Sequence, residues 1–185
     1  MNNDKNVVIK RTREVITYAE LWHISDHLLK SGQETPRGSA LKFMASIVFT
    51  AFTLEAYLNH IGPKILPCWN DIESLSPNKK LNIIAELLKV EIAYGKRPWQ
   101  TMKYLFRFRN DIAHGKSTVI HEEEIVSLEK VDDEPFKFAK TSWEKYGMKQ
   151  NNAIQARKDV EKIITTINKA AGFNDAFIMG LQMRT

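Results

Sequence analysis

The apolar residues of this chain recur at helical spacing along most of its 185 residues. Residues three and four positions apart lie on one face of an α-helix, so this spacing predicts helices with one buried face. Runs that alternate in the manner of β-strands are rare. Five helical segments are predicted, at about residues 11–30, 39–60, 77–88, 98–115 and 152–171.

Local breakers predict where several of these helices begin and end. Ser31-Gly32 is expected to end the first helix, and Gly62-Pro63 is expected to end the second. Ser76-Pro77 predicts the start of the third helix, because serine caps helix N-termini and proline fits the first helical position.

The segment from residue 116 to residue 150 has no helical period and contains acidic runs. We predict an irregular insertion here, with a short hairpin of residues 118–120 against 125–128 as an alternative. The other connections are short, which favours an all-α fold, an antiparallel up-and-down bundle of four to five helices. The length suits a single domain over residues 1–185.

Composition and motifs exclude several classes of protein. The single cysteine, Cys68, cannot form an intrachain disulfide, and neither a zinc-binding pattern nor a glycine-rich phosphate motif is present, so no metal or cofactor is expected. The N-terminal segment lacks the apolar run of a signal peptide. The longest uncharged stretch, Phe43 to Leu54, is shorter than the roughly 20 residues of a membrane span. We therefore expect a cytoplasmic protein outside the membrane, whose net charge of +5 permits an anionic partner.

Two charged residues interrupt the apolar stripes. On the fourth predicted helix, Arg109 shares an arc of roughly 120° with Met102, Leu105, Phe106, Ile112 and Ala113. Glu55 lies in the same way on the second helix, among Ile47, Val48, Ala51, Leu54 and Leu58. Burying an unpartnered ion costs several kcal/mol, so Glu55 and Arg109 are expected either to meet or to border one polar cleft. A purely structural ion pair is an equal alternative.

The segment that contains Arg109 continues through Asn110 to His114 and Gly115. Arg109 and His114 would point away from each other on a continuing helix, and they converge only if the helix ends at the histidine. Gly115 is a usual residue for such an end. Asn110 precedes His114 by four residues and so lies on its face of the helix. Histidine and arginine at a helix end can act on a phosphodiester, since imidazole transfers a proton and guanidinium stabilises phosphoryl charge.

The run Arg109-Asn110-Asp111-Ile112-Ala113-His114 resembles the R-polar-x(3–5)-H signature of HEPN-domain proteins. The run Phe-Thr-Leu-Glu-Ala-Tyr-Leu around Glu55 is similar to a segment in the second helix of bacterial members. The resemblance covers about residues 11–115 and the last helix. It implies a helical bundle that forms a homodimer in which two copies of the motif face one cleft. Active members are metal-independent endoribonucleases, and many are toxins of toxin–antitoxin pairs or antiviral defence effectors.

For this chain the resemblance implies that RNA is the substrate and that His114 is the general acid/base for attack of a ribose 2′-OH. Arg109 would stabilise the phosphoryl charge, and Asn110 would position both groups. Support of Arg109 by Glu55 is an inference from the helical faces. A cognate antitoxin protein is a further expected partner, although the chain lacks the tyrosine after the histidine that marks members silenced by nucleotidylation. The alternative function is a non-catalytic HEPN-like module that binds a nucleotide or a partner protein.

Overall fold

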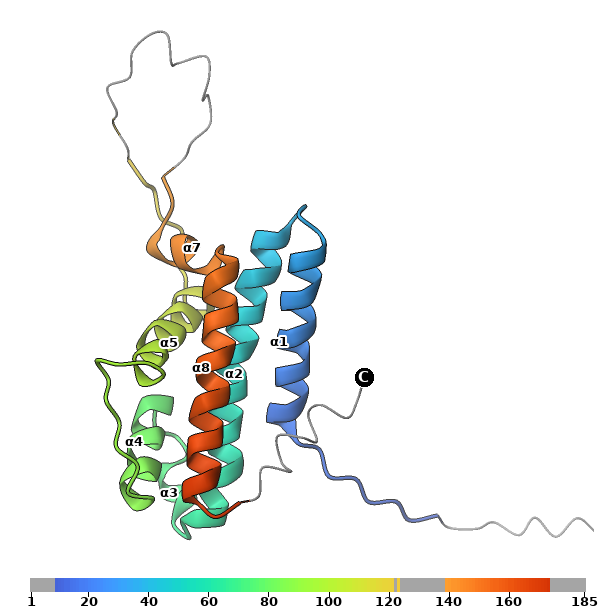
Figure 1. Cartoon of the computed structure of the whole chain (residues 1–185), viewed down its shortest axis with the longest axis vertical. Helices are drawn as coiled ribbons and strands as arrows, with labels where there is room; N and C mark the ends of the chain where they lie inside the picture. The colour runs from blue at the N-terminus through green and yellow to red at the C-terminus, as the bar shows by residue number, and fades with distance from the viewer. Residues whose placement is uncertain (1–8, 122, 124–138, 174–185) are drawn as a thin grey trace, which may run out of the picture.

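The protein, seen in a computed structural model, is all-helical, as predicted (Figure 1). The structure describes residues 9–121, 123 and 139–173, and within these ranges it contains helices and no strand. The helices are α1 (Thr17–Glu34), α2 (Ser39–Ile65), α3 (Trp69–Ile72), α4 (Pro77–Leu87), α5 (Trp99–Ala113), α7 (Ser142–Gly147) and α8 (Gln150–Ala170).

The central helix is α2, which contacts α1, α4, α5, α7 and α8. Figure 1 shows α1 and α2 running in opposite directions, whereas α8 runs in the same direction as α2. By length and composition alone, α2 is the one helix in the described ranges that could cross a membrane. Half of its apolar window is buried inside the bundle. The contacts on several sides therefore explain why its sequence is apolar almost all round.

The core lies where α2 meets α4, α5 and α8. Leu54, Leu81, Leu105 and Ile163 are fully buried there. Each such side chain stabilises the fold by about 1.5–3 kcal/mol relative to an exposed position. On α2 and on the first half of α5, most residues of the apolar stripe predicted from the sequence are buried.

Polar contacts join α1 to its neighbours. The hydroxyl of Ser25 lies 2.7 Å from that of Thr50 on α2, and both side chains are fully buried. Arg157 on α8 lies over the Trp22 ring at 3.7 Å and forms an ion pair of 3.1 Å with Asp26. Because Ser25 and Arg157 have polar partners on other helices, these contacts also specify which helices pack together.

The predicted end of α1 at Ser31-Gly32 is wrong, because the helix continues to Glu34. Its start is also later than predicted, at Thr17 instead of near Arg11. Gly32 is buried, and a Cβ atom there would lie 2.6 Å from the Phe43 ring on α2. The glycine therefore allows two helices to approach closely and does not stop the first one.

The predicted end of α2 at Gly62-Pro63 is wrong for a similar reason, since this helix reaches Ile65. A Cβ atom on Gly62 would lie 2.2 Å from the ring of Trp69. Trp69 belongs to the short helix α3, which the sequence did not predict, and it is almost fully buried. Packing of this ring on the last turns of α2 outweighs the local preference for a helix end.

The predicted irregular insertion at 116–150 contains helix α7, and α8 begins at its last residue. A capping box starts α7: the Glu144 N–H donates to Thr141 Oγ1 at 3.3 Å, and the Thr141 N–H donates to Glu144 Oε2 at 2.7 Å. In the alternative hairpin, residues 118–120 form no strand, and residues 125–128 lie outside the described part of the chain. The Thr-x-x-Glu pattern is a known helix-start signal that could have predicted α7.

The buried face of α5 differs from the predicted arc in its second half. Ile112 is 40% exposed and Ala113 is exposed, whereas Phe108, outside the arc, is only 2% exposed. The cause is α7, because the Phe108 ring packs against Gly147 and lies 5.5 Å from the Tyr146 ring. Helix α7, which the sequence did not predict, therefore determines which side of the second half of α5 is buried.

Candidate active site

Arg109 and Glu55 meet between α5 and α2, as one of the two sequence interpretations predicted. A hydrogen-bonded ion pair joins Arg109 Nη2 to Glu55 Oε2. The Arg109 side chain is 17% exposed and that of Glu55 is 29% exposed. The pair is therefore largely shielded from water, and each charge compensates the burial of the other.

The surroundings of Arg109 fix the orientation of its guanidinium. The second terminal nitrogen, Nη1, donates a hydrogen bond of 2.9 Å to Asn110 Oδ1. The rings of Phe52 and Phe106 each lie 5.9 Å from the guanidinium carbon, within the range of cation–π contacts. Arg109 Nε is buried and has no hydrogen-bond partner among the described residues. This planar group is held by contacts on its edge and by aromatic rings.

Helix α5 ends at Ala113, and His114 follows as its C-cap. The His114 N–H donates a 2.9 Å hydrogen bond to the Asn110 carbonyl, and the imidazole lies at the exposed end of the helix. A Cβ atom on Gly115 would lie 2.7 Å from the Asp111 carbonyl oxygen. The predicted helix end at the histidine is confirmed, and Gly115 serves it by allowing this close approach.

A pocket of about 510 Å³ opens beside His114, and we refer to it as the His114 pocket. Its lining includes Asn110, His114, Lys116 and Trp143, the last from α7. Arg109 does not line this pocket, but its hydrogen bond to Asn110 connects it to the pocket wall.

The structure thus brings the four predicted site residues into two linked groups. Glu55, Arg109 and Asn110 form one hydrogen-bonded chain, while Asn110 and His114 share the pocket. Among the described residues, no hydrogen bond joins the His114 side chain to Arg109 or to the Asn110 amide.

The charges at the His114 pocket are mixed, with an excess of cations. Arg107 and Lys116 line it together with one carboxylate, Asp111. Arg107 Nε lies 3.9 Å from Asp111 Oδ2, and the Arg107 side chain is 70% exposed. Such a surface can attract an anionic ligand. In the described part of the chain, no group of three histidine, cysteine, aspartate or glutamate residues could hold a metal ion.

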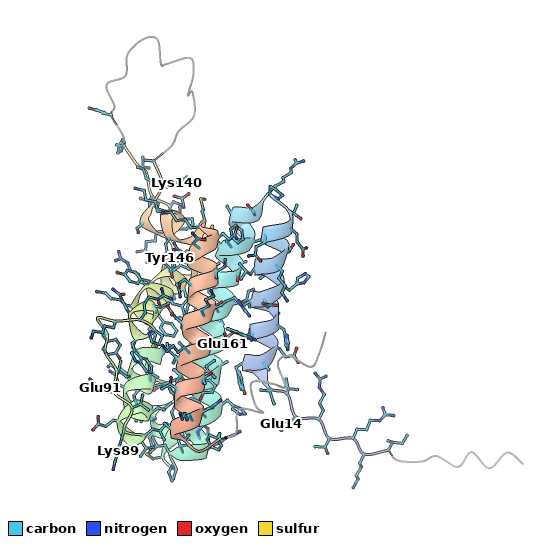
Figure 2. The ribbon with its side chains drawn as sticks, in the orientation of Figure 1. Glu14, Lys89, Glu91, Lys140, Tyr146 and Glu161 are labelled. Atoms are coloured by element: carbon cyan, nitrogen blue, oxygen red, sulfur yellow. The ribbon has the colours of Figure 1, made fainter. Side chains whose placement is uncertain are left out.

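The sequence did not predict the aromatic part of this surface. A second pocket of about 340 Å³ lies between α5 and α7, and its walls include Tyr104, Phe108, Trp143 and Tyr146. Figure 2 places Tyr146 at the end of the bundle where α7 lies over α5. We refer to this second pocket as the aromatic pocket. Spacing on α5 places Tyr104 and Phe108 on one face, but only α7 completes the walls.

No family model, no curated protein and no solved structure matches this chain.

Proposed function

We propose that this protein is a metal-independent endoribonuclease that cleaves RNA by attack of a ribose 2′-OH on the adjacent phosphate. The observation that supports it is the guanidinium of Arg109, oriented by Glu55 and Asn110 and five residues before the exposed His114 at the end of α5. A preorganised guanidinium stabilises phosphoryl charge without reorganising during the reaction.

The proposed step balances without a cofactor. The 2′-oxygen forms a bond to phosphorus while the bond from phosphorus to the 5′-oxygen breaks. The neutral imidazole of one His114 accepts the proton of the 2′-OH. The protonated imidazole of a second His114, from another copy of the chain, donates a proton to the leaving 5′-oxygen. The products are a 2′,3′-cyclic phosphate and a 5′-OH, and Arg109 compensates the charge on the equatorial oxygens.

One chain supplies a single His114, so the proposal includes a homodimer in which two motifs face one RNA strand. Exposed apolar side chains beside the motif support this assembly: Phe52 is 36% exposed and Ile112 is 40% exposed. Both lie next to Arg109, on α2 and on the last turn of α5. Light scattering at micromolar concentration should give twice the chain mass, and a monomer would contradict the dimer.

The biological setting proposed for this activity is the cytoplasm, as a toxin or an antiviral defence effector with a cognate antitoxin protein as partner. Expression should then stop growth of a bacterial host, and the His114→Ala variant should not. Normal growth with active wild-type enzyme would contradict a toxic role.

The test of the chemistry is incubation of purified protein with single-stranded RNA in EDTA. Cleavage should persist and leave 2′,3′-cyclic phosphate ends, and a 2′-O-methyl substrate should stay intact because its nucleophile is blocked. His114→Ala should lower the rate about 10²- to 10⁴-fold. Activity that disappears in EDTA, or that survives in His114→Ala, would overturn the proposal.

A second candidate is a module that binds a nucleotide or a partner protein without catalysis. The observation that favours it is the lack of a hydrogen bond, within the described residues, between the His114 side chain and Arg109. Binding of a nucleotide by calorimetry, without cleavage of any RNA, would select this alternative.

A further inference from the structure

The aromatic pocket and the His114 pocket adjoin each other. Arg107, Asp111, Ser142 and Trp143 line both of them. A ligand that fills one pocket therefore reaches the edge of the other across Trp143 and Arg107. The end of α5 and the start of α7 form one continuous surface.

The aromatic pocket offers ring faces and edges to a flat group. The rings of Tyr104 and Tyr146 lie 6.3 Å apart and nearly parallel, with an interplanar angle of 23°. Tyr104 is 49% exposed, so its ring is accessible from solvent. The volume of about 340 Å³ is near the lower end of the range for ligand sites, which is about 300–1,000 Å³. The pocket suits one planar ring system better than a large ligand.

The rim of the aromatic pocket is cationic. Lys145 on α7 and Lys149 before α8 line it together with Arg107, against the single carboxylate of Asp111. Neither lysine forms an ion pair within the described ranges, and both are exposed. Burial raises the pKa of Tyr146 to about 12, so its hydroxyl stays protonated even in alkaline solution near pH 10. Flat rings beside cations are what an unpaired base and its phosphates require.

We propose that the aromatic pocket binds one unstacked base of single-stranded RNA and thereby places a neighbouring phosphate in the His114 pocket. The inference rests on the proposed function, because it takes RNA as the ligand. It adds the substrate class: single strands bind, and duplexes do not, because a paired base cannot leave its stack to enter the pocket. Tyr104 is a binding residue in this proposal, and its ring supplies the accessible stacking surface.

The test measures binding of a fluorescently labelled 2′-O-methyl RNA hexamer by anisotropy, since this probe cannot be cleaved. Tyr104→Ala should weaken binding about 5- to 100-fold, the usual effect of removing one stacking ring. Tyr104→Phe should bind within about 2-fold of wild type, because stacking needs the ring and not the hydroxyl. The matched control is Tyr94→Ala, which removes a tyrosine of similar exposure, 45%, that lines neither pocket.

The cationic rim has its own pair of variants. Lys145→Ala should weaken binding and lower the salt dependence of the binding constant by about one phosphate contact. Lys158→Ala removes another exposed lysine, on α8, that lines neither pocket, and it should leave affinity unchanged. Circular dichroism and thermal melts of all variants show whether each remains folded.

Three results would overturn the inference: unchanged hexamer affinity in folded Tyr104→Ala, equal binding of a duplex of the same sequence, or equal binding of a free mononucleotide. Cleavage assays keep this inference separate from the proposed function. If Tyr104→Ala cleaves RNA as fast as wild type, the aromatic pocket does not bind a base, but the proposed ribonuclease activity stands. If hexamer binding depends on Tyr104 but natural RNA is not cleaved, the aromatic pocket binds a base, and the proposed ribonuclease activity is wrong.

Discussion

Arg109 on α5 forms a hydrogen-bonded ion pair with Glu55 on α2, a residue 54 positions earlier in the chain. The contact joins the central helix to the helix that ends at His114. It gives the site a rigid base, because the arginine cannot move without exposing or abandoning the carboxylate. Variants of this pair can therefore distinguish a structural role of Arg109 from a catalytic one.

Glu55→Gln should lower the free energy of unfolding by about 1–3 kcal/mol, because it leaves Arg109 largely buried without a counter-ion. Urea unfolding measures this. Arg107→Gln is the control and should change stability by less than about 0.5 kcal/mol, because that arginine is 70% exposed and 3.9 Å from its partner. In a double-mutant cycle with Arg109→Gln, the losses should not add, and additivity within about 0.3 kcal/mol would contradict a coupled pair.

Arg109→Lys should lower the rate of RNA cleavage about 10²-fold while the fold stays intact. A lysine retains the charge but cannot bond Glu55 and Asn110 at once while stabilising a phosphoryl oxygen. Arg37→Lys is the control, because this exposed arginine lines neither pocket, and it should retain most activity. Single-turnover rates at saturating enzyme separate this effect from binding, and equal rates for the two variants would exclude a special role for Arg109.

Gly147→Ala should destabilise the packing of α7 on α5. A Cβ atom there would lie 2.6 Å from the Phe108 ring and 2.8 Å from Met44. The expected loss is about 1–3 kcal/mol, the usual cost of overpacking a core. Gly95→Ala is the control, because no atom lies within 4 Å of its added Cβ. If α7 packs as described, only the first variant should also weaken the protection of α7 amides in hydrogen exchange.

Acid should destabilise the fold through His60. Burial, and secondarily the charge of Lys64, lower the pKa of this imidazole below its ordinary value of 6.5, while Glu14 acts in the opposite sense. Lys64 Nζ lies 2.7 Å from His60 Nε2, a contact that suits a neutral ring. The unfolded chain therefore binds a proton near pH 6.5 that the folded chain does not bind. Stability should fall as pH drops from about 7 toward the folded-state pKa, by at most about 1.4 kcal/mol per pH unit.

Urea unfolding of wild type and His60→Gln between pH 7.5 and pH 5 isolates this contribution. The variant cannot titrate at this position, so its stability should depend less on pH over that interval. Parallel pH profiles for the two proteins would show that His60 titrates alike in the folded and unfolded states.

The sequence by itself determined the five longer helical segments, α1, α2, α4, α5 and α8, and where α5 ends. Apolar spacing, Ser76-Pro77 and Gly115 are local signals, and helical hydrogen bonds are local as well, so these predictions depend on little else. The sequence also indicated that Arg109 and Glu55 needed partners, because an ion in an apolar stripe is costly wherever the chain folds.

Tertiary structure alone decided the rest. Gly32 and Gly62 read locally as helix ends, but the Phe43 and Trp69 rings that pack on them belong to other segments. The aromatic pocket exists only because α7 packs against α5, and the apolar spacing within either helix does not predict that contact. Contacts between distant segments depend on side-chain shape and volume. The free energy gained by burying an aromatic ring exceeds a local helix-ending preference of about 1 kcal/mol.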